Sequence, residues 1–68
     1  MAMIYVGNVD SRSTEANVRS AFEVYGRVSN VNVMAGFALV EMTDDTQAQN
    51  AISDLNSQGS WAVHVLAA

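Results

Sequence analysis

Two stretches with alternating side chains are separated by only two residues, Ala35 and Gly36. Because successive side chains of a β-strand point to opposite faces, each alternating stretch predicts a strand with its own inner and outer face. A two-residue link joins antiparallel strands in a tight hairpin and leaves no room for the helix that a parallel connection needs. The chain is therefore expected to build an antiparallel sheet around a hairpin of residues 28–34 and 37–42.

The second strand of this hairpin is apolar on both faces. Ala38, Val40 and Met42 share the face expected to enter the core, whereas Phe37 and Leu39 point the other way. Large apolar side chains exposed together often mark a surface that binds a partner. This stretch is therefore the first candidate for a binding surface.

Two further stretches predict strands. Residues 3–9 are rich in β-branched and aromatic types, with Tyr5 and Gly7 on the outer face. Residues 61–67 predict the last strand, whose side chains divide into an inner pair, Val63 and Val65, and an outer set, Ala62, His64 and Leu66. Trp61 shares the inner parity, so it is expected at the edge of the core or, alternatively, as an anchor for a partner.

Two stretches between the predicted strands carry helical signals. Thr14 is a typical N-cap, and Gly26 is expected to end that first helix. Asp44 is expected to cap a second helix, with Gln47 completing a capping box, and residues 56–59 are expected to form the turn after it. The i, i+3, i+4, i+7 spacing predicts the buried faces: Val18, Ala21, Phe22 and Tyr25 in the first helix, and Ala48, Ala51, Ile52 and Leu55 in the second.

The predicted order of elements is β-α-β-β-α-β over residues 1–68. This is the order of the α+β ferredoxin-like fold, in which two helices cover one face of a four-stranded antiparallel sheet and leave the other face open. The 68 residues are enough for one small domain of this kind, so we expect a single, minimal domain.

The net charge of the chain argues against nucleic-acid binding that depends mainly on contacts with phosphates. The chain has three arginines, no lysine and seven acids, a net charge of −4, whereas nucleic-acid affinity depends largely on basic side chains. Arg12 and Arg27 are expected in loops near strand ends, where a phosphate could pass. Arg19 is expected on the polar side of the first helix, without a specific role.

Residue types also argue against several kinds of site. The absence of cysteine and the presence of a single histidine leave no cluster of metal ligands, so no metal or other cofactor is expected. Asp44 and Asp45 are explained as helix-start residues, and no nucleophile accompanies them, so no enzymatic activity is expected. No apolar run is long enough to span a membrane.

The two stretches with aromatic outer faces resemble the signature strands of the RNA recognition motif family. Residues 4–9, Ile-Tyr-Val-Gly-Asn-Val, match its six-residue signature throughout. Its eight-residue signature is matched by residues 35–42 at Gly36, Phe37, Ala38 and Val40. This stretch departs from the signature where Ala35 replaces a basic residue and where Leu39 and Met42 replace aromatics. The short link before Gly36 is similar to that of the compact members found in SR splicing factors, in LARK-type splicing regulators and in coactivator-associated paraspeckle proteins.

The resemblance implies single-stranded RNA binding on the open sheet face, with bases stacking on Tyr5 and Phe37. It also implies modest affinity, because Ala35 lacks a phosphate-holding charge and Leu39 lacks the π-face of a ring, where stacking is worth about 1–3 kcal/mol per base. Further contacts are expected around these rings: base contacts from Asn8, Asn30, Asn32, Leu39, His64 and Leu66, and phosphate contacts from Arg12 and Arg27.

Simpler interpretations remain open for the same residues. Tyr5 and Phe37 could be a cross-strand pair that only steadies the sheet, and Asn30, Asn32 and His64 could be solvated polar positions. The acidic balance and apolar outer face also fit a module for protein interaction or homodimer formation, with little or no RNA binding. The resemblance further implies an intracellular protein of RNA processing such as splicing, nuclear in a eukaryote and cytoplasmic in a bacterium.

Overall fold

The computed structural model describes residues 1–10, 12–59 and 61–67. Ser11, which falls in the predicted loop after the first strand, lies outside the described residues, as do Ser60 and Ala68. The elements follow the predicted order: β1 (Ala2–Gly7), α1 (Glu15–Glu23), β2 (Val28–Met34), β3 (Phe37–Met42), α2 (Asp45–Gln58) and β4 (Ala62–Ala67).

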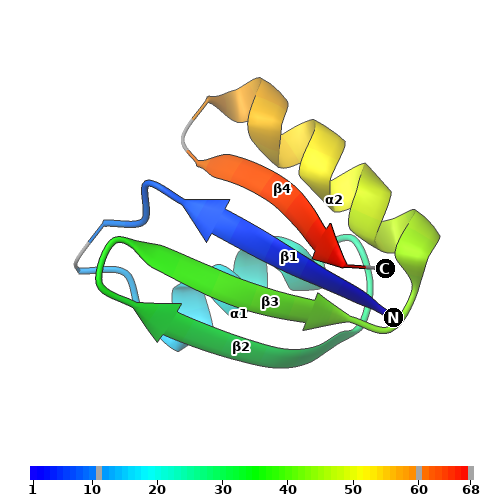
Figure 1. The fold of residues 1–68 in the computed structure, drawn as a ribbon, viewed down its shortest axis with the longest axis horizontal. Helices are drawn as coiled ribbons and strands as arrows, with labels where there is room; N and C mark the ends of the chain where they lie inside the picture. Colours follow the sequence, from blue (N-terminus) through cyan, green and yellow to red (C-terminus); the bar gives the residue numbers. More distant parts are fainter. Residues whose placement is uncertain (11, 60, 68) are drawn as a thin grey trace.

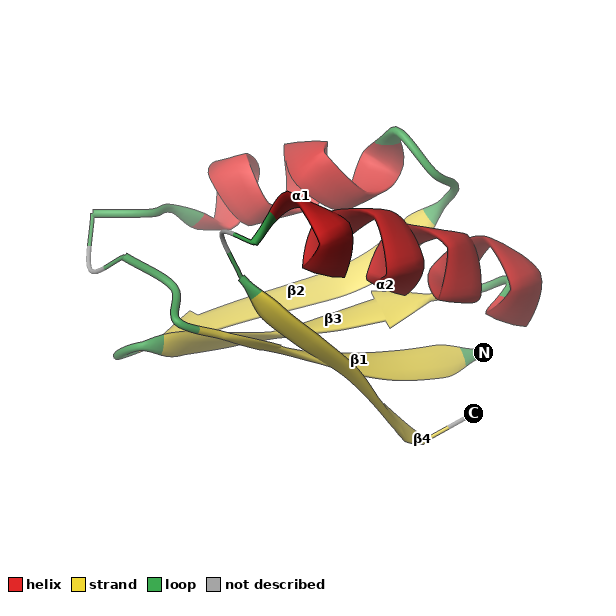
Figure 2. Ribbon diagram, turned by 90° about the horizontal axis from the view of Figure 1, so that it is seen from above, coloured by secondary structure: helices red, strands yellow, loops and turns green. Residues whose placement is uncertain are grey.

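The four strands form one antiparallel sheet in the order β2-β3-β1-β4 (Figure 1). Both helices lie on the same side of it, and no element of the described residues covers the other face (Figure 2). The predicted ferredoxin-like fold is therefore confirmed, with β1 and β3 at the centre. No helix in the described part of the chain has the length and apolar character needed to cross a membrane.

The core lies between the helices and the inner sheet face. The predicted stripe of α1 buries Val18 and Phe22, and that of α2 buries Ala48, Ala51 and Leu55. Met42 is fully buried, as its inward parity predicts. The strands supply most of the remaining core side chains, all under a tenth exposed: Ala2, Ile4, Val6, Val28, Val31, Ala38, Val40 and Val63. Val9, which follows β1, is buried as well.

The hairpin link has the tight geometry that its length predicts. Met34 lies opposite Phe37, and Gly36 has a φ of 84°. This is the left-handed region, which glycine adopts without strain. The Gly36 carbonyl accepts a hydrogen bond of 3.2 Å from the Val9 amide, so the link is also tied to the chain leaving β1.

The expected role of Gly26 as helix terminator is wrong. Helix α1 ends at Glu23 with Val24 as a right-handed C-cap, and Gly26 has no positive φ. The absence of a side chain matters there for another reason: a Cβ at Gly26 would collide with the Gln47 side chain. Gly26 therefore allows the start of α2 to approach the chain between α1 and β2.

The expected turn at 56–59 is also wrong, because α2 continues through Gln58 and ends at Gly59, which has a φ of 78°. The extra helical turn holds Asn56 beside β4. Its amide donates to the Val63 carbonyl at 2.8 Å and its oxygen accepts from the Val63 amide at 2.9 Å. Asn56 thus covers the backbone of an edge strand, which otherwise offers unpaired groups to other chains.

The expectation that Val65 faces inward is wrong. Val65 lies opposite the buried Ile4 but is 42% exposed, because β4 is an edge strand whose register shifts next to this pair.

The expectation that Arg19 has no specific role is also wrong. Arg19 donates to the Val28 carbonyl at 3.4 Å and lies 3.8 Å from Glu15 and 3.7 Å from Glu23, so it links α1 to β2.

Replacing Asn56 should weaken the attachment of α2 to β4. We expect Asn56→Ala to lower the free energy of unfolding by about 1–3 kcal/mol, since two hydrogen bonds of about 0.5–1.5 kcal/mol each are lost. Urea denaturation would measure this change. Asn50→Ala, at an exposed position of the same helix, is the matched control. Equal stability of the two variants would contradict a structural role for Asn56.

Candidate RNA interface

The open face of the sheet presents side chains in rows that run across the strands. Residues directly opposite each other in antiparallel strands point to the same face. One row at the middle of the sheet therefore comprises Asn32, Leu39, Tyr5 and His64. The next row, toward the β2–β3 hairpin, comprises Met34, Phe37, Gly7 and Ala62.

Three rings lie next to one another at the centre of this face. The Tyr5 and Phe37 ring centroids are 5.6 Å apart with planes at 20°, and those of Tyr5 and His64 are 6.3 Å apart with planes at 18°. At these distances nearly parallel rings are offset from one another rather than superposed. Tyr5 and Phe37 are half-buried and His64 is exposed, so the rings form a continuous aromatic surface.

Gly7 provides the space in which the Tyr5 ring lies. A Cβ built on Gly7 would be 3.0 Å from Tyr5 Cε1 and 3.5 Å from its hydroxyl oxygen. The tyrosine ring therefore extends along its own strand, over the glycine and toward Phe37, which pairs with Gly7. Sequence reasoning assigned no role to Gly7, although its place in the six-residue signature was a signal for one.

The face is nearly uncharged. Glu41 is the one charged side chain of the four strands as described, and one of its carboxylate oxygens accepts from the Ser29 hydroxyl at 3.3 Å. The two candidate phosphate ligands flank opposite ends of the sheet. Strands β1 and β2 both run antiparallel to β3, so the end of β1, which Arg12 follows, and the start of β2, which Arg27 precedes, lie at opposite ends. Arg12 is 92% exposed and only 3.9 Å from the Asp10 carboxylate. The rings thus have no basic side chain beside them on the described strands.

The other predicted RNA-binding residues are spread more widely over the sheet than the three rings. Asn32 lies in the central row, but the Asn30 side chain accepts a hydrogen bond from the adjacent Val31 amide at 3.0 Å. Asn8 lies beyond β1 with a φ of 61°, and Leu66 is 57% exposed near the end of β4. Met34, 50% exposed opposite Phe37, belongs to the surface although sequence reasoning left it out of the site.

The pattern of rings on an open sheet can be compared with known proteins. The RNA recognition motif matches residues 4–60. The chain belongs to the RNA recognition motif family. The crystal structure of RNA binding protein PG1 superposes with a TM-score of 0.85 at 31% identity, covering 100% of this chain and 94% of that one. The Rna15 RRM with bound RNA has the same fold, with a TM-score of 0.78 at 22% identity over 97% of this chain and 81% of that chain.

Two curated relatives extend the comparison. The serine/arginine-rich splicing factor RSZ23 of Oryza sativa subsp. japonica is 37% identical over 96% of this chain and 34% of its own length. The protein named "Putative RNA-binding protein RbpD" of Nostoc sp. is 43% identical over 78% of this chain and 65% of its own length. The chain thus spans about a third of the splicing factor that it matches.

Adding a methyl group at Gly7 should displace the Tyr5 ring. We expect Gly7→Ala to keep the fold but to weaken the nuclear Overhauser effects between the Tyr5 and Phe37 rings, because the new Cβ occupies the ring's space. In a Tyr5→Ala background the same change should be neutral or stabilising, since alanine in a strand is favoured over glycine by about 0.5–1 kcal/mol. Unchanged ring contacts in Gly7→Ala would contradict this account.

Proposed function

We propose that this domain binds single-stranded RNA on its open sheet face, with bases stacking on Tyr5 and Phe37. The observation that carries the proposal is the pair of nearly parallel rings, 5.6 Å apart, at the centre of a face that none of the elements in the described part of the chain covers. Every base has a π-face, so such a surface can bind unpaired nucleotides of varied sequence. RNA-binding proteins among the relatives support the same conclusion.

Around the two rings, the proposed contacts follow from position. His64 and Asn32 are neighbours of Tyr5 and Leu39 in the central row, where a ring can stack and an amide can read a base edge. Leu39 packs against a base without stacking. At the margins of the sheet, nucleotides contact Asn8, Asn30 and Leu66. Where the RNA strand crosses the two ends of the sheet, its phosphates contact Arg12 and Arg27.

Affinity should be modest and weakly dependent on salt. Each phosphate contact in single strands contributes about −0.7 to the slope of log affinity against log salt, and the strands supply no basic side chain. Stacking therefore provides most of the binding free energy. The splicing factors among the relatives favour a role in RNA processing, in the nucleus of a eukaryote; in a bacterium the same domain would act in the cytoplasm.

Removing either ring should reduce RNA affinity. We expect Tyr5→Ala and Phe37→Ala each to weaken binding of a short single-stranded RNA by about five- to 150-fold, the equivalent of about 1–3 kcal/mol per stacked base. Tyr5→Phe keeps a ring and should bind nearly as well as the parent. NMR titration measures affinity and fold together.

The matched control lies on the opposite side of the sheet. Val24 is 81% exposed next to α1, so Val24→Ala should leave RNA binding unchanged. If folded Tyr5→Ala or Phe37→Ala bound RNA as tightly as the parent, the rings would only steady the sheet and the stacking proposal would fail.

Restoring the family's residues should strengthen binding in two distinguishable ways. Leu39→Phe adds a π-face and should raise affinity by about five- to 150-fold without changing the salt slope. Ala35→Lys adds a cation and should steepen that slope by about 0.7. Titrations at several salt concentrations separate the two effects. Ala35→Gln, neutral and of similar length, is the control; a salt slope equal to that of Ala35→Lys would contradict the phosphate contact.

A protein-interaction or homodimer function is the second candidate. It is favoured by the exposed apolar side chains on and around the open face, Met34 at 50% and Leu66 at 57%, and by the lack of basic side chains on the strands as described. Concentration-dependent dimerisation in sedimentation experiments, together with no response to RNA, would support this candidate over RNA binding.

A further inference from the structure

His64 lies at the centre of the open face, on the edge strand β4. It pairs with Tyr5 of β1, and its imidazole is nearly parallel to the tyrosine ring, with centroids 6.3 Å apart and planes at 18°. The side chain is exposed, so a ligand on the face can reach it. A nucleotide stacked on Tyr5 therefore lies within a Debye length of this imidazole, about 8 Å at physiological ionic strength.

The four strands as described hold no other side chain that can become positively charged. They contain no lysine and no arginine, and Glu41 is their one acid. Histidine is the side chain whose charge ordinarily changes between about pH 5 and pH 8, whereas the phenol of a neighbour such as Tyr5 stays neutral in that range. Among the strand residues, a positive charge at the centre of the open face can therefore come only from His64, and it depends on pH.

None of the ion pairs among the described residues involves His64. Glu41 shares the open face, but its carboxylate accepts a hydrogen bond from the Ser29 hydroxyl at 3.3 Å, and it lies on β3, which β1 separates from β4. Asp10 follows β1 and lies 3.9 Å from the Arg12 guanidinium. The charge of a protonated His64 is therefore available to a ligand.

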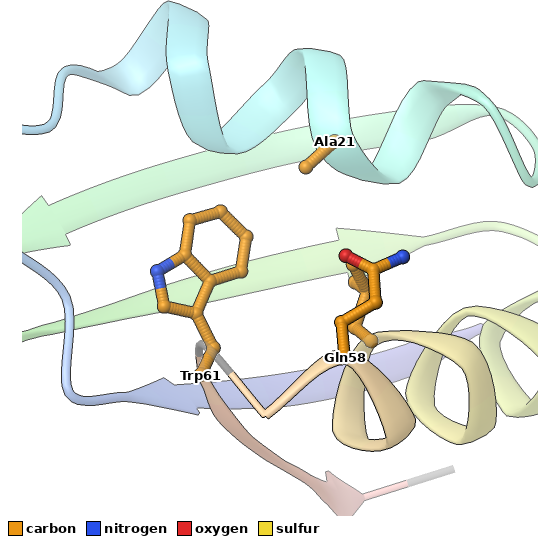
Figure 3. Close-up of a pocket in the computed structure, with 4 residues that line it drawn as sticks. Ala21, Gln58 and Trp61 are labelled. Carbon is orange, nitrogen blue, oxygen red and sulfur yellow. The ribbon is translucent and has the colours of Figure 1, made fainter.

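The helices place no charge beside His64, because in the described part of the chain both lie on the other side of the sheet (Figure 2). Trp61, just before β4, lies parallel to the buried Phe22 with ring centroids 6.4 Å apart, at the edge of the core where its parity predicts it. The pocket beside it is lined by uncharged residues (Figure 3): Ala21, Leu55, Gln58 and Trp61.

The acids of α2 and its cap lie behind the sheet and have partners of their own. Asp44 caps the helix, and Asp45 lies 3.1 Å from the N-terminal ammonium. Asp54 accepts a hydrogen bond from the Tyr25 hydroxyl, whose pKa is raised by burial and by the charge of this carboxylate. Tyr25 therefore stays neutral where histidine titrates. Of these groups, none faces His64.

We propose that His64, in its protonated form, contacts a phosphate of RNA bound on the aromatic surface, so that RNA affinity rises as the pH falls; this role rests on the RNA binding proposed above. A neutral imidazole only stacks, whereas an imidazolium also attracts the phosphate of a nucleotide held on Tyr5. The charge that Ala35 does not supply beside β3 is thus supplied from β4, at mildly acidic pH only.

The expected gain in affinity follows from Coulomb's law. Attraction between two unit charges about 7 Å apart raises affinity about threefold at a dielectric constant of about 80 and about 50-fold at a constant of about 20. One added phosphate contact also steepens the slope of log affinity against log salt by about 0.7. The slope identifies a phosphate contact, because stronger stacking alone would leave it unchanged.

The probe is a short, fluorescently labelled oligouridine, since uracil bases stay neutral over the pH range in which histidine titrates. Anisotropy titrations at about pH 5.5 and about pH 8, each at several salt concentrations, give the affinity and the salt slope. We expect tighter binding at the lower pH by about three- to 50-fold, with a slope steeper by about 0.7.

Substitutions of His64 separate its charge from its ring. His64→Gln and His64→Phe cannot be protonated, and each should bind with one affinity at both pH values. His64→Arg is charged throughout and should show the steeper salt slope at both. Glu41→Gln, which removes the one acid of the described strands, is the matched control and should keep the pH dependence. Amide spectra check that each variant is folded.

The outcomes distinguish this role of His64 from RNA binding itself. Equal affinity and equal salt slope of the parent at both pH values would overturn the role of His64 and leave stacking on the rings intact. A pH dependence that persists in both His64→Gln and His64→Phe would also overturn it, since another group would then be responsible. No binding of the parent at either pH would overturn RNA binding on the rings and the role of His64 together.

Discussion

Packing of two amphipathic helices against one face of the sheet is the interaction on which the rest of the structure depends. The inner side chains of β1 and β3 are buried under α1 and α2, with Phe22 fully enclosed. Apolar burial of this kind is the main free-energy gain of folding. The helices cover the inner face only. Among the described residues, no element packs on the outer face, so its rings remain accessible.

The two sides of the molecule differ in charge as well as in shape. The helices with the cap Asp44 hold a net charge of −4, while the strands have Glu41 as their one charged side chain among the described residues. A face with so little charge repels phosphate little but also attracts it little. The aromatic surface is therefore suited to stacking with bases rather than to contacts with phosphates.

Close contacts between side chains and the backbone fix the finer geometry on both sides of the sheet. The Tyr5 ring occupies the space over Gly7, and the Gln47 side chain occupies the space over Gly26. In each case a missing Cβ lets a neighbouring side chain lie flat against the backbone. Near the end of α2, the Asn56 side chain makes the two hydrogen bonds to the Val63 backbone that a neighbouring strand would otherwise make. These local contacts position the rings, the helix ends and the edge strand within a fold that helix and strand periodicity already define.

The sequence by itself determined the element order, the inner and outer faces of the strands apart from Val65, the caps at Thr14 and Asp44 and the rings at Tyr5 and Phe37, because these follow from periodicity and local hydrogen bonding. Only the tertiary structure decided where the helices end, since Gln47 rather than helix termination explains Gly26, and contacts with β4 hold Asn56 in α2. The ring spacing, the link from Arg19 to Val28 and the Trp61 pocket likewise depend on segments distant in sequence. No local pattern encodes such contacts, because they arise only when the elements pack together.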